Sequence, residues 1–181
     1  MKQPSLVLGI DPGTAVTGYG VVASDGRATT LVECGVIRTN AKDPLPSRLL
    51  DIHEGVRELI ARHRPDTLSI EDVFFARNVR TTLVLGHARG VILLAGQQAE
   101  LTIHEYAPTE IKKAITGRGG ATKEQVQYMV ARLLHLKHAP EPADAADGVA
   151  AALCACMKFV ASGAALAPTS PSIISSKAFR R

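Results

Sequence analysis

Apolar residues near the N-terminus fall into three segments with the length of β-strands. These segments span residues 6–11, 17–24 and 29–39, and Ser24-Asp25-Gly26 is a turn signal between the second and the third. Segments joined by such short connections pair most simply as antiparallel neighbours. The first 40 residues therefore predict a three-stranded antiparallel meander.

After residue 40 the pattern changes to helices that alternate with strands. Apolar residues at helical spacing predict a helix from Pro44 to Pro65, and further helices are expected over 78–99, over 109–117, after residue 122 and over about 143–161. Strands are expected at 67–74 and 101–108, and Thr109 and Thr122 have the features of N-caps. The prediction is an α/β fold with a mixed five-stranded sheet flanked by helices. One domain would cover residues 1–161, and 162–181, rich in Ser, Ala and Pro, would form a disordered tail.

The helix expected over 78–99 is apolar on most of its faces. Its apolar positions include Leu83, Leu85, Val91 and Leu94. A helix of this kind needs a second surface against which to bury itself. It is a candidate dimer interface, and a plain core helix is the open alternative.

The composition excludes several classes of protein. The chain has 181 residues, 46% of them hydrophobic, but no apolar run approaches the roughly 20 residues that span a bilayer. No cleavable leader is recognised at the N-terminus, so we expect a cytoplasmic protein without membrane contact. The three cysteines lack metal-ligand spacing, which argues against a zinc site and a disulfide framework.

Positive charge is concentrated in one part of the chain. The formal net charge is +4, and the stretch from Arg77 to Lys137 contains nine Lys and Arg against four Glu, a net charge of +5. Clustered positive charge is typical of a surface that binds phosphates, although an ordinary solvated surface remains an alternative.

Four carboxylates stand at positions where a charge needs a partner. Asp11 ends an apolar strand, and Glu71 lies within another, with Asp72 on the opposite face by strand alternation. Asp144 and Asp147 open the last helix at a spacing that places them on one side of it. Taken alone, this last pair is more typical of acids that complement a helix dipole.

The four carboxylates make chemical sense together only if they share a cation. Without one, clustered negative charges repel and raise one another's pKa. Oxygen ligands without a His or Cys cluster favour Mg²⁺, with Mn²⁺ as an alternative. Two such ions, roughly 3.5–4 Å apart, fit in-line phosphodiester hydrolysis. The sequence thus predicts a two-ion nuclease site at Asp11, Glu71, Asp144 and Asp147.

Five motifs occur in one order along the chain: GIDPGTAVTGYGVV, IEDVFFARN, LGHARGV, ATKEQVQYMV and DAADGVAAAL. Together they resemble the RuvC family of Holliday-junction resolvases, over about residues 6–160. The resemblance implies an RNase H-like fold and a homodimeric, metal-dependent endonuclease that makes paired symmetric nicks in four-way DNA junctions during recombination and repair. The family's branch-migration proteins, RuvA and RuvB, are further candidate partners.

The resemblance also implies roles for single residues. It makes the four carboxylates the catalytic, metal-binding set, with Asp144 at a position that can be His in relatives. Phe74 would stack on junction bases, and Arg77, Lys112 and Lys123 would contact backbone phosphates. Charge and position add Arg80, Lys113 and Arg118 to these DNA contacts.

Two other functions are compatible with parts of the pattern. GIDPGTAVTGYG is similar to the phosphate loop of ATP-binding proteins of the actin and sugar-kinase type, but that fold needs two such domains. A junction-binding protein without catalysis would use the basic stretch alone and would have no need of the carboxylates. ATP turnover would indicate the first, and junction binding without nicking the second.

Overall fold

The chain folds around one five-stranded sheet in the computed structural model, which describes residues 4–72 and 79–162. The strand order is β3-β2-β1-β4-β5. The strands are β1 (Ser5–Asp11), β2 (Val16–Ser24), β3 (Thr29–Arg38), β4 (Thr67–Glu71) and β5 (Thr102–Tyr106). The helices are α1 (Leu45–His63), α2 (Val79–Gln98), α3 (Pro108–Thr116), α4 (Lys123–Leu133) and α5 (Ala143–Ser162).

The sheet is mixed, as the sequence predicts. β1, β2 and β3 form an antiparallel meander, whereas β4 runs parallel to β1 and β5 runs parallel to β4. The parallel pairings follow the two crossover helices, since parallel neighbours cannot be joined by a tight turn. The predicted fold class is therefore confirmed.

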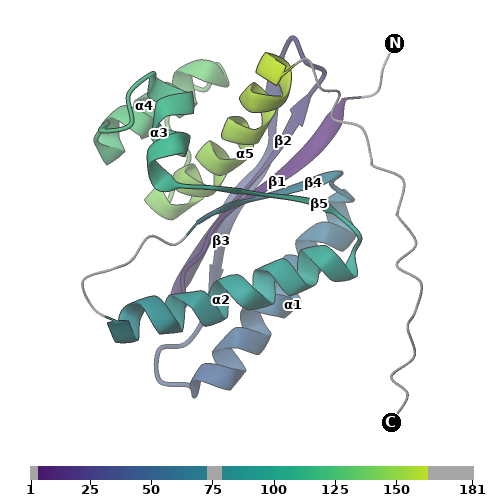
Figure 1. Cartoon of the computed structure of the whole chain (residues 1–181), viewed down its shortest axis with the longest axis vertical. Coiled ribbons are helices and arrows are strands. Elements are labelled where there is room, and N and C mark those ends of the chain that lie inside the picture. The colour runs from purple at the N-terminus through teal and green to yellow at the C-terminus, as the bar shows by residue number, and fades with distance from the viewer. Residues whose placement is uncertain (1–3, 73–78, 163–181) are drawn as a thin grey trace.

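Helices cover both faces of the sheet, and strand alternation decides which side chain meets which layer. Leu8 and Ile10 of β1 are fully buried against α1 and α2, whereas Val7 belongs to the core beneath α3, α4 and α5. Figure 1 shows α1 and α2 on one side of the sheet and the other three helices on the opposite side. Odd-numbered residues of β1 therefore point toward α5.

Glycines allow α5 to lie unusually close to β1 and β2. A Cβ atom at Gly9 would overlap the main chain of α5, and a Cβ at Gly18 would overlap the carbonyl oxygen of Asp144. On the helix side, a Cβ at Gly148 would collide with the main chain of Tyr19. The contact is further filled by a run of buried alanines in α5. This close approach brings the first turn of α5 to the end of β1.

The start of α3 differs from the prediction. The N-cap is Ala107, not Thr109, and Pro108 takes the first helical position. Proline suits that position because its fixed φ is helical and its missing N–H is not needed there. Glu110 completes the start by accepting a hydrogen bond from the main-chain N–H of Ala107. Thr122, by contrast, is the N-cap of α4 as expected, and its side chain accepts from Gln125 N.

Helix α2 is half core and half surface. Ala88, Ile92 and Ala95 are buried against the sheet, but Val79, Leu83 and Leu94 are 72%, 60% and 50% exposed. The apolar residues on the outer side of α2 therefore have no partner within the described part of the chain.

The structure gives the state of the cysteines and the character of the helices. Cys34, Cys154 and Cys156 are free thiols, two of them buried. In the ranges 4–72 and 79–162, no helix combines the length and the apolar character that crossing a membrane requires. The predicted tail lies outside the described residues except for Ser162, where α5 ends, so the boundary at residue 161 stays a prediction.

Candidate active site

Two of the four predicted carboxylates lie at the ends of neighbouring parallel strands. Ile10 of β1 pairs with Ile70 of β4, so the residues that come next, Asp11 and Glu71, lie side by side on neighbouring strands. Ser69 donates a hydrogen bond of 2.6 Å to the carbonyl of Ala151 in α5, which shows that odd-numbered residues of β4 face that helix. Strand alternation therefore places Asp11 and Glu71 on the face that α5 covers.

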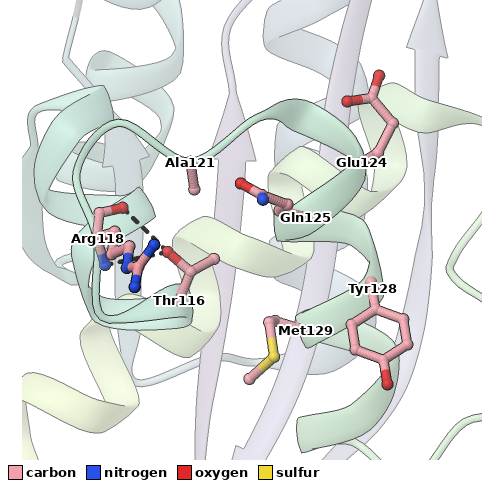
Figure 2. Close-up of a pocket in the computed structure, with 7 residues that line it drawn as sticks. All are labelled: Thr116, Arg118, Ala121, Glu124, Gln125, Tyr128 and Met129. Atoms are coloured by element: carbon pink, nitrogen blue, oxygen red, sulfur yellow. Dashed lines mark hydrogen bonds between the residues drawn. The ribbon is translucent and has the colours of Figure 1, made fainter.

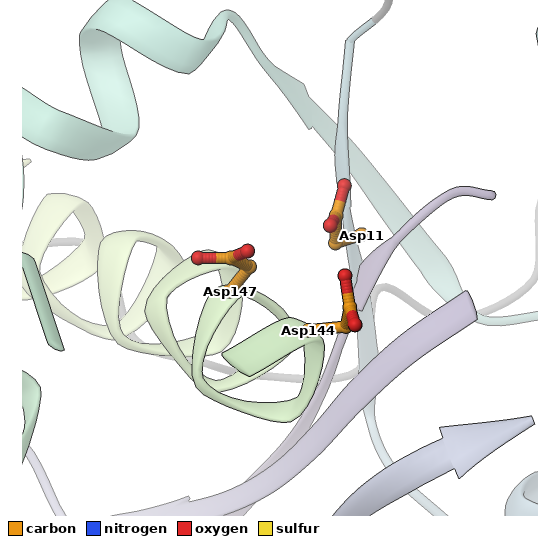
Figure 3. A group of neighbouring side chains, drawn as sticks. All are labelled: Asp11, Asp144 and Asp147. Carbon is orange, nitrogen blue, oxygen red and sulfur yellow. The ribbon is translucent and has the colours of Figure 1, made fainter. Parts of the chain in front are cut away.

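The other two carboxylates come from the first two turns of α5. Asp11, Asp144 and Asp147 each offer one carboxylate oxygen, and these three oxygens all lie within 4.8 Å of one another. Figure 3 shows the side chains of Asp144 and Asp147 on one side of α5, next to Asp11. The spacing of three residues in a helix explains why both reach the same point.

Glu71 joins this group through a shared pocket. A hollow of about 220 Å³ is lined by Asp11, Glu71, Pro108, Ile111, Lys112, Lys123, Val126, Asp147 and Ala150. Asp11 and Asp147 thus belong both to the pocket and to the compact aspartate cluster. Glu71 lies in the pocket but outside the cluster, and Asp144 lies in the cluster but not in the pocket lining. The predicted carboxylates therefore form two overlapping groups, the aspartate cluster and the pocket lining, which share Asp11 and Asp147.

Burial and mutual repulsion disfavour charge on these groups. Burial raises the pKa of Asp11 to about 8, with further contributions from the charges of Glu71, Asp147 and Asp144. Burial also raises the pKa of Glu71 to about 7, and the charge of Asp147 adds to it. The pKa of Asp147 is raised mainly by burial, although Lys123 opposes the shift. The chain by itself does not compensate this concentration of negative charge.

The donor set fits a divalent cation. Lys123 is the first residue of α4, and its Nζ lies 2.6 Å from Oδ2 of Asp147. Lys112 lines the same pocket, and the pKa values of Asp11 and Glu71 remain raised in the presence of these two ammonium groups. All the clustered ligand atoms are carboxylate oxygens, the ligands that Mg²⁺ and Mn²⁺ prefer.

The loop that follows Asp11 is held in place by a residue of α1. Arg48 donates from Nη2 to the carbonyl of Thr14 at 2.5 Å and from Nε to Oγ1 of Thr39 at 3.0 Å. Thr39 itself donates to the same carbonyl of Thr14 at 2.5 Å. These bonds hold the main chain three residues beyond Asp11 against α1 and the end of β3.

Asp72, the residue after Glu71, makes a different contact. Asp72 turns to the opposite face, as alternation predicts, where its Oδ1 lies 3.0 Å from Nη2 of Arg89 in α2. The same guanidinium also forms an ion pair with Glu105 of β5. Arg89 therefore ties α2 to the ends of two strands, next to a predicted catalytic residue. The sequence contained Arg89 in the motif LGHARGV but gave no sign of these partners.

The predicted DNA-contacting residues lie at different distances from this pocket. Lys112 and Lys123 line it, and Arg118 lines a second hollow beside α4. Lys113 is exposed on α3, and Arg80 is exposed in the first turn of α2. Phe74 and Arg77 lie outside the described residues. Of the five predicted DNA contacts that the structure describes, two line the pocket of the carboxylates.

Comparison with known proteins agrees with this geometry. The profile of the family "Crossover junction endodeoxyribonuclease RuvC" matches residues 7–155. The RuvC protein of Chloroflexus aggregans is 50% identical over 147 residues, which are 81% of this chain and 90% of that protein. The RuvC protein of Pelotomaculum thermopropionicum is 48% identical over 149 residues, 82% of this chain and 91% of that protein.

Solved structures show the same likeness. Thermus thermophilus RuvC superposes with a TM-score of 0.79 at 36% identity, covering 87% of this chain and 96% of the other. The same protein in complex with a Holliday junction substrate also gives a TM-score of 0.79, at 34% identity. The yeast mitochondrial Holliday junction resolvase Ydc2 shares the fold, with a TM-score of 0.60 at 15% identity. The sheet order, the acidic site and these matches together show that the chain belongs to the RuvC family of crossover junction endodeoxyribonucleases.

Proposed function

We propose that this protein resolves four-way DNA junctions by paired, symmetric, metal-dependent nicks during recombination and repair. The observation that carries the proposal is the convergence of Asp11, Asp144 and Asp147 within 4.8 Å, with Glu71 in the adjoining pocket. A relative of known structure, Thermus thermophilus RuvC, binds a Holliday junction substrate. The family match brings the same substrate class to this chain.

Each carboxylate has a proposed role. Asp11 would contribute to holding both of two divalent ions, because it belongs to the aspartate cluster and the pocket and the charges of all three other carboxylates act on it. Glu71 and Asp147 would each hold one ion, and Asp144 would support or orient the site. Divalent ions at such a site supply an activated water and neutralise the charge of the leaving oxygen. Mg²⁺ is the proposed physiological ion, with Mn²⁺ as a substitute.

The residues around the carboxylates would position the scissile strand. Lys112 and Lys123 line the acidic pocket and offer positive charge to a phosphate beside the metal ligands. The pocket of about 220 Å³ admits a phosphodiester and a water, and its side walls are the apolar residues Ile111, Val126 and Ala150. Each cut would leave a 5′-phosphate and a 3′-hydroxyl that ligase can join.

A loss of Lys123 should weaken binding in a salt-dependent manner. We expect Lys123→Ala to lower junction affinity and to reduce the slope of log K against log salt by about one, as for one lost phosphate contact. The measurement is a salt series of anisotropy titrations in the absence of divalent ions. Arg27→Ala is the matched control, since Arg27 is exposed in the β2–β3 turn at the opposite end of the sheet. An unchanged slope for Lys123→Ala would remove this residue from the DNA contacts.

The proposal includes a homodimer, because two symmetric nicks need two active sites. The outer side of α2, with Val79 and Leu83, is the proposed interface. We expect Leu83→Asp to shift the protein from dimer to monomer at micromolar concentration, measured by light scattering. Val32→Asp, at a residue 49% exposed on β3, is the matched control. A dimer that survives Leu83→Asp unchanged would place the interface elsewhere.

RuvA and RuvB complete the proposed set of partners. They would deliver a migrating junction, and the resolvase would cut it in the cytoplasm. No membrane partner belongs to this proposal.

The direct test is cleavage of synthetic junctions. Fixed and mobile four-way junctions are incubated with the protein and Mg²⁺ or Mn²⁺, and the nicks are mapped on each strand, with linear duplex as the control. We expect paired nicks at symmetric positions in the junctions only, in products that ligase reseals. Binding without any nick would favour a non-catalytic junction-binding protein.

A further inference from the structure

A second hollow adjoins the active site on the other side of the first turns of α4. It has a volume of about 520 Å³ and is lined by Thr116, Arg118, Ala121, Glu124, Gln125, Tyr128 and Met129. Figure 2 shows Thr116, the last residue of α3, and Arg118 of the following loop on one side and Tyr128 and Met129 of α4 on the other. Arg118 is the one residue of this lining for which the sequence predicts a DNA contact.

Tyr128 is unusual for a large aromatic residue. It is 63% exposed, whereas the neighbouring Val126 and Val130 of the same helix are buried. An exposed aromatic ring at the edge of a hollow offers an apolar face for contact with a ligand. The floor beside it is apolar, because Ala121 is 5% exposed and Met129 packs against the core.

Arg118 provides positive charge on the opposite wall. In the part of the chain that the structure describes, its guanidinium has no ion-pair partner. The main chain of Arg118 is fixed, since its N–H donates to Oγ1 of Thr116 at 3.2 Å and that hydroxyl also contacts the carbonyl of Lys112 at 2.8 Å. The loop therefore presents a free cation from an ordered backbone, while Glu124 is the one acid in the lining.

The two hollows share the N-terminal part of α4. Lys123 and Val126 line the acidic pocket, whereas Glu124, Gln125 and Tyr128 line the second hollow. Residues 123–129 rise about 9 Å along the helix axis, so the two hollows lie beside the same two turns of α4.

From these observations we propose that the hollow between the α3–α4 loop and α4 binds an unpaired nucleobase of the strand being cut. The base stacks on Tyr128 over the apolar floor, and Arg118 contacts the phosphate of the same nucleotide. A paired base has both faces occupied by its neighbours in the duplex, so only an extruded or unstacked base can use the ring. The inference rests on the proposed function and adds a specific site for a nucleotide beside the cleaved bond.

The experiment measures junction binding by the full chain without divalent ions. The junctions carry a single abasic nucleotide at each position within three of the branch point. We expect Tyr128→Ala to bind the intact junction about tenfold more weakly, consistent with the loss of one stacked base. When the abasic nucleotide replaces the stacked base, the junction affinity of the wild type should fall by the same factor. The affinity of Tyr128→Ala for that junction should fall no further. Tyr128→Phe should bind within twofold of the wild type because it keeps the ring.

Two results would overturn the base site. One is equal affinity of Tyr128→Ala and the wild type for the intact junction. The other is a loss in Tyr128→Ala that persists unchanged on every abasic junction, which would mean that the ring acts without a base. Thermal unfolding of the variant checks its fold, and Arg27→Ala serves as a surface control. The nicking assay of the wild type reports on the proposed function separately, since the binding arms need no cleavage.

Discussion

Replacement of Asp11 by Asn is expected to lower the rate of junction cleavage by at least about a thousandfold while junction binding persists. Asp11 lies in both the aspartate cluster and the pocket that contains Glu71, and the charges of Glu71, Asp144 and Asp147 all raise its pKa, so its carboxylate is central to the acidic site. Asparagine keeps the size of the side chain but removes the charge that binds the cations. Metal-assisted hydrolysis supplies several kcal/mol of barrier lowering, and about 1.4 kcal/mol corresponds to a tenfold change in rate.

The test compares single-turnover nicking in Mg²⁺ with binding in EDTA. The junction affinity should stay within a few-fold of that of the wild type. The substitution removes a negative charge near the DNA and therefore no attraction for its phosphates. Asp51→Asn is the matched control, since Asp51 is an exposed carboxylate of α1, outside the acidic pocket. Cleavage by Asp11→Asn at the wild-type rate would show that the assignment of the active site is wrong.

The same substitution is expected to stabilise the metal-free protein at neutral and alkaline pH. The folded-state pKa of Asp11 is raised from 3.8 to about 8, and that of Glu71 from 4.5 to about 7. Between the ordinary and the raised values, the folded state binds more protons than the unfolded state. Stability contributed by these groups is therefore fully present below about pH 4 and is lost as pH rises through 7 to 8.

Chemical denaturation in EDTA at several pH values measures this effect. We expect the free energy of unfolding of Asp11→Asn to equal that of the wild type near pH 4 and to exceed it by on the order of 2 kcal/mol at pH 8. Saturating Mg²⁺ should reduce or reverse the difference, because ions bind the folded wild-type site. A variant less stable than the wild type at pH 8 in EDTA would mean that Lys123 already compensates the carboxylate.

Part of the site follows from periodicity alone. Strand alternation separates Glu71 from Asp72, and the structure places the first on the α5 face and the second against Arg89. Helical spacing places Asp144 and Asp147 together. Such local rules work here because both elements are buried on a defined face, which leaves each side chain one direction to take.

Other features depend on contacts between distant segments and left no local signal. The pairing of Arg89 with Glu105 joins α2 to β5, and the ion pair of Lys123 with Asp147 joins α4 to α5. The start of α3 is a different case, because both Pro108 and Thr109 are acceptable at a helix N-terminus and only Ala107 as N-cap fits the chain leaving β5. The exposure of Tyr128 likewise appears only after α4 has packed with its other side on the core.

The sequence also could not predict that the carboxylates form two overlapping groups. Four acids on two strands and one helix predict a common site, but not that Glu71 lies apart from the aspartate cluster. The glycines of β1 and β2 let the first turn of α5 lie beside Asp11, whereas Glu71 stands on the next strand across the sheet.

Diffraction from crystals soaked in Mn²⁺ tests the central claim most directly, because anomalous scattering locates the ions independently of activity. The account predicts one peak at coordination distance, about 2.1 Å, from oxygens of Asp11 and the α5 aspartates, and a second shared by Asp11 and Glu71. Full occupancy of Mn²⁺ elsewhere, with none beside Asp11, would contradict it.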